Sequence, residues 1–135
     1  MKKVLSFTIS VVLIVSLFVV HVNAALPDEI SPLWDAMAAI EVSVGFVGHE
    51  GIASADVSGI HGITNQIDAI LILYEEVDGE LVYIDSTSGS GVTALGLEIY
   101  FDAESGSTYV AELIVTAYNS EGSETESFTD TNTCP

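Results

Sequence analysis

The stretch QIDAILILYEEVDGELVYI, residues 66–84, decides the fold because it holds two strand patterns and the turn between them. Apolar side chains recur at every second position from Ile67 to Leu73, which is the period of a strand with one buried face. Asp78 and Gly79 then form the residue pair that favours a two-residue hairpin turn. The stretch therefore predicts an antiparallel hairpin, in which residues 66–75 form one strand and residues 81–84 the next.

The same period-two pattern recurs on both sides of this hairpin. It covers residues 40–46, 53–57, 95–101, 108–118 and 123–129, and turn-forming residues separate these segments. A flexible Ser-Gly linker is expected at residues 86–91. Seven short strands with turn signals between them predict an all-β, seven-stranded immunoglobulin-like β-sandwich over residues 40–129, followed by a flexible tail at residues 130–135.

The residues before the strands follow a different pattern. Ser31 can cap a helix, and Pro32 suits the first helical position. The apolar residues of this segment would then share one face: Trp34, Met37, Ala38 and Ile40. Residues 25–39 are therefore expected to form a short N-terminal helical or turn segment that packs on the sandwich, while the alternative is a ligand platform around Trp34.

Residues 1–24 have the pattern of a secretory signal peptide. Lys2 and Lys3 precede an apolar run at residues 4–22, and small residues lead to a cleavage point between Ala24 and Ala25. The alternative is an uncleaved membrane anchor, because the run is close to the lower length limit for crossing a bilayer. Either way the domain is expected outside the cell, as a secreted or cell-surface protein with no membrane span after cleavage.

The charge of the chain narrows its possible partners. It has 20 Asp and Glu residues against two lysines, and both lysines precede the cleavage point. A nucleic-acid ligand is excluded because phosphate binding needs clustered cations. The acidity serves either solubility outside the cell or attraction of cations or of a basic partner. Carboxylates crowded together without partners are also expected to have raised pKa values in the folded state.

A resemblance is carried by GSTYVAELIVTAYNSEGSETES, residues 106–127, which is similar to the last hairpin of a fibronectin type III domain. Tyr109 occupies the position of that family's corner tyrosine, whose hydroxyl bonds to nearby backbone. Four residues match the inward positions of its sixth strand: Ala111, Leu113, Val115 and Ala117. The resemblance implies a fibronectin type III-like sandwich. The whole layout also resembles small exported proteins of Gram-positive bacteria whose function is unknown.

Two of the expected strands carry more apolar residues than one buried face needs. The surplus residues lie on the opposite face of strands that are neighbours in this fold, and we call them the outer stripe: Ile70, Ile72, Tyr74, Val110, Ile114 and Tyr118. An exposed apolar patch of this kind marks an interaction site. The stripe is either a contact surface for an unknown protein or a cell-wall or other extracellular ligand, or it is covered by the N-terminal segment or the linker.

The sequence contains no catalytic motif. His49 and His61 fall in loops without the pattern of a nucleophile and its base, and neither a zinc pattern nor a phosphate-binding loop is present. The chain is therefore expected to be a non-catalytic binding module without a cofactor. The alternative is a hydrolase that uses two carboxylates.

Two further features of the sequence are candidate sites. Glu76, Asp78 and Glu80 alternate beside Gly79, which is loosely similar to part of a calcium-binding loop and predicts at most weak calcium binding. The same residues also suit a hairpin turn without any metal. Cys134 is the single cysteine, and it predicts either a disulfide-linked dimer or a free thiol on the tail.

Overall fold

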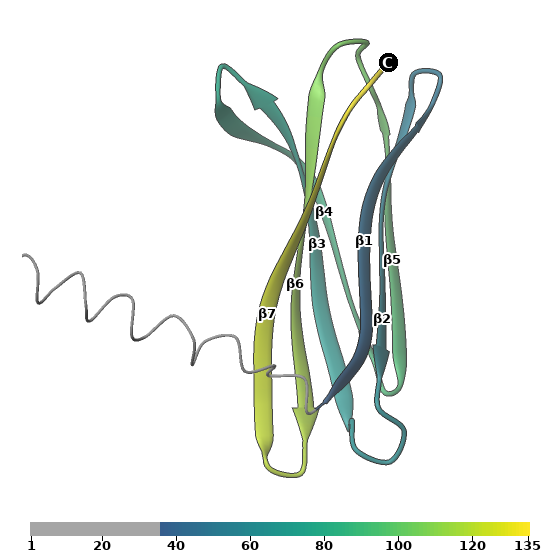
Figure 1. Cartoon of the computed structure of the whole chain (residues 1–135), viewed down its shortest axis with the longest axis vertical. Coiled ribbons are helices and arrows are strands. Elements are labelled where there is room, and N and C mark those ends of the chain that lie inside the picture. Colours follow the sequence, from purple (N-terminus) through teal and green to yellow (C-terminus); the bar gives the residue numbers. More distant parts are fainter. Residues whose placement is uncertain (1–35) are drawn as a thin grey trace, which may run out of the picture. The chain divides into compact units, whose positions relative to one another are not determined.

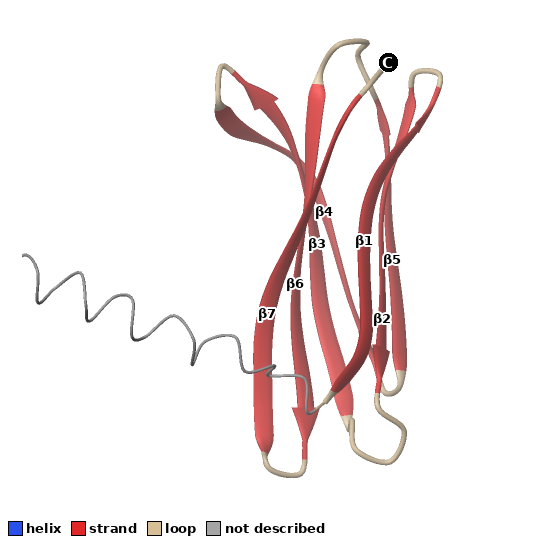
Figure 2. Cartoon of the chain, viewed as in Figure 1, coloured by secondary structure: helices blue, strands red, loops and turns tan. Residues whose placement is uncertain are grey.

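The computed structural model describes residues 36–135, which form two antiparallel sheets packed face to face (Figure 1). The first sheet has three strands, in the order β1 (Met37–Val47), β2 (Glu50–Gly59) and β5 (Ala94–Asp102). The second has four, in the order β4 (Glu80–Gly91), β3 (Gln66–Val77), β6 (Thr108–Asn119) and β7 (Gly122–Thr133). Strands and short connections make up this whole part of the chain (Figure 2). The predicted all-β, seven-stranded immunoglobulin-like sandwich is confirmed.

The β3–β4 hairpin has the turn that the sequence predicts. Asp78 has a φ of 53° and Gly79 a φ of 80°, and two positive φ values in a row define the turn that suits the twist of a hairpin. Because this short turn places β4 directly beside β3, β4 joins the sheet of β3 and β6. In a constant-type immunoglobulin domain, by contrast, the fourth strand lies in the sheet of the first, second and fifth.

The core lies between the sheets and takes alternate residues from both. Ile67, Leu71 and Leu73 of β3 and Leu113 of β6 are fully buried. The other sheet supplies smaller or branched side chains, namely Ala53, Ala55, Val57, Leu97 and Ile99. The inward faces predicted for residues 67–73 and 111–117 are therefore confirmed. Each fully buried Leu or Ile contributes about 1.5–3 kcal/mol, and residues 36–135 contain no Lys or Arg to form conventional salt bridges, so this core carries the stability.

One end of the core is closed by three aromatic rings. Phe46 lies 6.2 Å from Phe101 and 5.8 Å from Tyr109 between ring centroids, and the last two rings are 4.8 Å apart. The Phe101 ring lies over Gly51, where it leaves no room for a Cβ atom. The Tyr109 hydroxyl accepts a hydrogen bond from the Glu104 backbone N–H at 2.9 Å, which is the corner bond that the fibronectin type III resemblance implies.

The expected linker at residues 86–91 is wrong, because these residues form the second half of β4. Ser88 pairs with Ile70 of β3, and Gly91 pairs with Ile67. The glycines are present for packing: a Cβ atom at Gly91 would collide with the carbonyl group of Ala94 at the start of β5. Close approach between strands therefore explains the composition that flexibility was expected to explain.

The expected tail at residues 130–135 is also wrong. Strand β7 runs to Thr133, which pairs with Thr108 of β6. The Cys134 N–H donates to the Ser107 carbonyl at 2.9 Å, and the Ser105 hydroxyl donates to the Pro135 carbonyl at 2.7 Å. Backbone pairing with β6 and with the loop before it therefore holds the end of the chain.

The helical or turn segment expected at residues 25–39 is wrong where the structure describes it, because β1 already begins at Met37. A bulge between Met37 and Ala39 interrupts its pairing with β2. This end is closed by Thr64, whose hydroxyl donates to the Ala36 carbonyl and accepts from the Ile60 N–H at 2.7 Å. The signal peptide, its cleavage point and Trp34 lie outside the described residues. Residues 36–135 contain no helix that is long and apolar enough to cross a membrane.

Candidate binding surface

The outer stripe lies on one face of the four-stranded sheet, as predicted. Ile70 pairs with Ile114 and Tyr74 pairs with Val110, so β3 and β6 are neighbours and these side chains share a face. Exposure differs along the stripe. Ile70 is 45% exposed and Tyr118 is 36% exposed, whereas Val110 is buried and the remaining three side chains are half-buried.

A carboxylate interrupts the stripe at Glu112, which pairs with Ile72. The Tyr74 hydroxyl donates to one Glu112 oxygen at 3.3 Å, and the Ser127 hydroxyl donates to the other at 3.0 Å. Burial, together with the negative charge of Glu112, raises the pKa of Tyr74 above its usual value of 10.0. The centre of the stripe is therefore an apolar surface with one fixed carboxylate.

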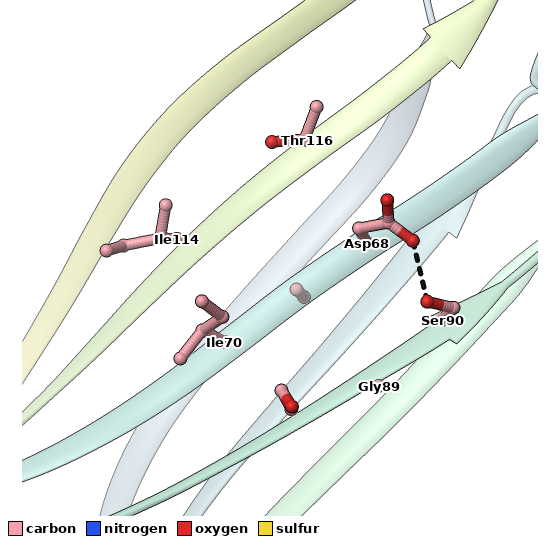
Figure 3. Close-up of a pocket in the computed structure, with 8 residues that line it drawn as sticks. Asp68, Ile70, Gly89, Ser90, Ile114 and Thr116 are labelled. Atoms are coloured by element: carbon pink, nitrogen blue, oxygen red, sulfur yellow. Dashed lines mark hydrogen bonds between the residues drawn. The ribbon is translucent and has the colours of Figure 1, made fainter.

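A hollow of about 340 Å³ lies at one end of the stripe, over β4, β3 and β6 (Figure 3). Asp68 lies at its edge, where it accepts hydrogen bonds from the Ser90 hydroxyl at 2.6 Å and from the Gln66 side-chain amide at 2.8 Å. The bond from Ser90, followed by that from Gln66, lowers the pKa of Asp68 below its usual value of 3.8. The raised carboxyl pKa values expected from the charge are wrong at this residue, because neighbouring donors stabilise its charged form.

Rows of hydroxyl side chains, which were not predicted from the sequence, flank the stripe. Cross-strand partners of the stripe face lie on β4 and β7, and they are Ser86, Ser88, Ser90, Ser123, Thr125, Ser127, Thr129 and Thr131. The signal was present in residues 123–133, where Ser or Thr occupies every second position. The face on which these hydroxyls lie depends on the register of β7 against β6. That register places them beside the stripe and not toward the core.

A group of exposed apolar side chains lies beyond the stripe, at the end of the β3–β4 hairpin. Tyr83 pairs with Tyr74 and Leu81 with Glu76, so Tyr83 and Leu81 continue the face of the outer stripe, whereas Val77 and Val82 point to the opposite face. Figure 1 shows the end of the hairpin leaning away from the other strands. We call its apolar residues the hairpin patch: Val77, Leu81, Val82, Tyr83 and Ile84, which are 44%, 54%, 49%, 59% and 38% exposed.

The acids of the hairpin surround this patch but form no metal site. Glu76 pairs with Leu81 and Glu80 pairs with Val77, and adjacent cross-strand pairs point to opposite faces. Glu76 and Glu80 therefore lie on opposite faces of the hairpin, with Asp78 in the turn between them. Within residues 36–135 no three His, Cys, Asp or Glu side chains gather closely enough to hold a metal ion. The three carboxylates suggested for weak calcium binding, those of Glu76, Asp78 and Glu80, therefore do not converge on one point in the structure.

Cys134 does not present its thiol to another molecule. The side chain is 1% exposed, and its Sγ lies 3.7 Å from the Gly48 carbonyl oxygen. The disulfide-linked dimer suggested for this residue would require the end of the chain to leave its position against β6.

The free edges of β1 and β4 differ in what covers them. The Val44 N–H of β1 donates to Asp130 at 2.8 Å, and Asn132 donates to the Val44 carbonyl at 2.9 Å, so β7 side chains occupy the free edge of β1. Strand β4 is also an edge strand, with β3 on one side and no strand of the described chain on the other. An exposed apolar edge of this kind is a template for pairing with another chain.

The hydrolase alternative requires two acids and a histidine in one hollow, and the three-stranded sheet has two hollows that contain acids. One hollow contains Asp56 and Glu98, and another contains Glu50 and Asp102. Both histidines of the described part lie in turns and line neither hollow. These hollows therefore do not bring two acids and a histidine together.

Comparison with known proteins identifies no family for the chain. No family model and no curated protein matches the chain. CsgH of R. palustris is 11% identical, with 70% of this chain and 89% of that chain covered and a TM-score of 0.43. A PapD-like domain of human CEP192 is 12% identical, with 76% and 86% covered and a TM-score of 0.44. A β-glucuronidase of Parabacteroides merdae is 16% identical, with a TM-score of 0.46, but the 70% of this chain that aligns spans only 13% of that enzyme. At these identities and TM-scores the likeness carries no function across.

Proposed function

We propose that the chain is an exported, non-catalytic binding module that contacts an extracellular protein or a cell-wall ligand through its four-stranded sheet, with the hairpin patch at the centre. The observation that carries this proposal is the patch itself. Five apolar side chains, each 38–59% exposed, lie at the end of the β3–β4 hairpin, with Val77 on β3 and residues 81–84 on the edge strand β4. Their burial against a partner would supply the hydrophobic driving force for association, whereas a patch of this kind is unfavourable in water.

The rest of the sheet supports a contact that extends beyond the patch. The outer stripe continues from Tyr83 through Tyr74, and the fixed carboxylates of Glu112 and Asp68 stand within or beside it. Hydrogen bonds already restrict both carboxylates, so they would lose little freedom on binding a partner. Hydroxyl side chains line both sides. Apolar area in the middle with polar groups around it is the usual composition of an interface.

Export and the closer kinship are part of the same proposal. The signal pattern in residues 1–24 and the strongly acidic composition favour a protein that works outside the cell. Within the immunoglobulin-like class, the corner bond of Tyr109 and the last hairpin favour kinship with fibronectin type III domains.

Photo-crosslinking tests the proposed surface. A photoreactive phenylalanine derivative would replace Tyr83 in the full exported chain, which would then be incubated with surface extract of the producing organism. Tyr100 is the matched control, because it is 72% exposed but lies on β5 of the other sheet. We expect one discrete adduct from position 83 and none from position 100. Equal labelling at both positions, or no adduct at either, would contradict the proposed surface.

A further inference from the structure

The outer edge of β4 along residues 81–84 is an open place in the sheet for another strand. Every strand of a sheet presents N–H and C=O groups on both sides, and at β4 the described chain pairs only the side toward β3. Proteins protect such edges with charged side chains, cover or bulges. The β1 edge has this protection at Val44, from Asp130 and Asn132 of β7. In β4 a bulge leaves Ile84 without a partner in β3, but Leu81, Val82 and Tyr83 keep their pairing and place three apolar side chains in succession beside the open edge.

Addition of a strand would bury the hairpin patch from both faces. Side chains that face each other across paired strands share one face of the sheet. An added strand would therefore place alternate side chains beside Leu81 and Tyr83 on one face and beside Val82 on the other. Those three are 49–59% exposed and have apolar area to lose. In this mode of recognition, backbone hydrogen bonds provide affinity and the alternating side chains provide specificity.

The negative charge of the hairpin indicates that the added strand is basic. Acids surround the open edge at Glu75, Glu76, Asp78, Glu80 and Asp85, and residues 36–135 contain no Lys or Arg. A second copy of the chain would bring the same carboxylates against each other, and like charges across paired strands are destabilising. A strand that alternates Lys or Arg with apolar residues would instead pair its cations with these acids, and it would be attracted from a distance.

We infer that the edge of β4 along residues 81–84 binds an extended, basic segment of another exported protein as an added strand. This inference rests on the proposed function and names the class of its partner.

The test is a titration of the full exported chain, labelled with ¹⁵N, with a capped synthetic peptide of alternating lysine and valine. We expect saturable binding that weakens as salt is added. The amide signals of residues 81–84 should shift, and their exchange with solvent should slow. A peptide with glutamate in place of lysine tests the charge. A lysine–valine peptide that is N-methylated at alternate residues tests the backbone bonds.

Two pairs of variants locate the contact. Val82→Lys puts a cation beside the open edge, and we expect binding to weaken about tenfold. Its control, Tyr100→Lys, makes a similar change on exposed β5 and should leave the affinity unchanged. Glu80→Gln should weaken binding by about two- to fivefold, since opposite-charge pairs across strands contribute at this level. Its control is Glu121→Gln, in the exposed β6–β7 turn. The amide spectrum of each variant would show whether it is folded.

The possible outcomes separate this inference from the proposed function. Equal binding of the N-methylated peptide, or an unchanged affinity in Val82→Lys, would show diffuse charge attraction and overturn the inference. Self-association of the chain through β4 would overturn it as well. Failure of the basic peptide to bind, together with a retained crosslink at position 83, would overturn the basic strand and leave the proposed surface standing. If the crosslink at position 83 were lost as well, both the basic-strand inference and the proposed surface would be contradicted.

Discussion

Tyr109 connects the packing of one end of the sandwich to the loop that crosses it. Its ring is 2% exposed and packs against Phe46 and Phe101, while its hydroxyl accepts the hydrogen bond of the Glu104 N–H. One side chain thus fills the core and satisfies a backbone donor in the connection between β5 and β6. Removal of the hydroxyl alone separates these two contributions.

Tyr109→Phe should lower the free energy of unfolding by about 1 kcal/mol, because the ring remains but the Glu104 N–H loses its acceptor. Urea unfolding followed by circular dichroism measures this. Tyr100→Phe is the matched control, since its hydroxyl donates to Glu98 at 2.9 Å on the exposed face of β5. The control should change stability by a few tenths of a kcal/mol at most, in line with surface substitutions generally. Equal losses in both variants would contradict a special role for the corner bond.

Asp68 predicts a dependence of stability on pH. Its folded pKa lies below the usual 3.8, so the unfolded chain binds the proton more readily. The stabilising contribution of its hydrogen bonds is complete above pH 3.8 and is lost as the pH falls through the folded pKa. The stability difference between the native chain and Asp68→Asn should therefore shrink below that pH. Urea unfolding at a series of pH values measures it, and a constant difference down to pH 2 would contradict it. Ser90→Ala should reduce the same dependence.

At the scale of elements, β7 links the two sheets as well as completing one of them. It pairs with β6 through its backbone, and two of its side chains bond both backbone groups of Val44 in β1. These bonds replace the pairing that another strand would otherwise supply to β1. The sandwich therefore gains a connection between its sheets at the same place where it closes an edge.

Asp130→Ala should reduce the free energy of unfolding by about 1.5–3 kcal/mol, because a hydrogen bond to a charged group is lost and the Val44 N–H is left without this acceptor. It should also increase self-association, since the β1 edge becomes open. Chemical unfolding and light scattering measure the two effects. Asp130→Asn keeps an acceptor oxygen and should retain part of the stability. Thr129→Ala, on the opposite face of β7, is the control. A stable and monomeric Asp130→Ala variant would contradict this role.

The elements differ in how far the sequence predicted them. The hairpin turn at Asp78-Gly79 and the inward face of β3 follow from neighbouring residues, and both were predicted correctly. The second half of β4 was mistaken for a linker, because the purpose of Gly91 appears only when β5 lies against it. The outer stripe was predicted from alternation alone. The hairpin patch was not, since the exposure of residues 81–84 depends on where the opposite sheet ends, and no local pattern carries that information.

For the whole molecule, the distribution of charge leaves the core to hold the fold together. The chain has 20 Asp and Glu residues but only two lysines, and both lysines are in its first three residues. Repulsion among carboxylates opposes the compact state, while burial of apolar area and the hydrogen bonds of the sheets favour it.

The melting temperature should therefore rise with salt at neutral pH. The Debye length falls from about 30 Å at 0.01 M to about 8 Å at 0.15 M, so repulsion between separated carboxylates is largely screened over this range. Scanning calorimetry over this range of sodium chloride concentration measures the effect. A melting temperature that does not respond to salt would show that the acids lie too far apart to destabilise the fold.

The start of β1 and the end of β7 lie at opposite ends of the sandwich (Figure 1). Tension between Met37 and Cys134 would therefore act along these strands, and the bonds that join Val44 to Asp130 and Asn132 would be sheared together instead of opening one after another. Stretching of single molecules should give one high rupture force, which falls when Asp130 is replaced by alanine.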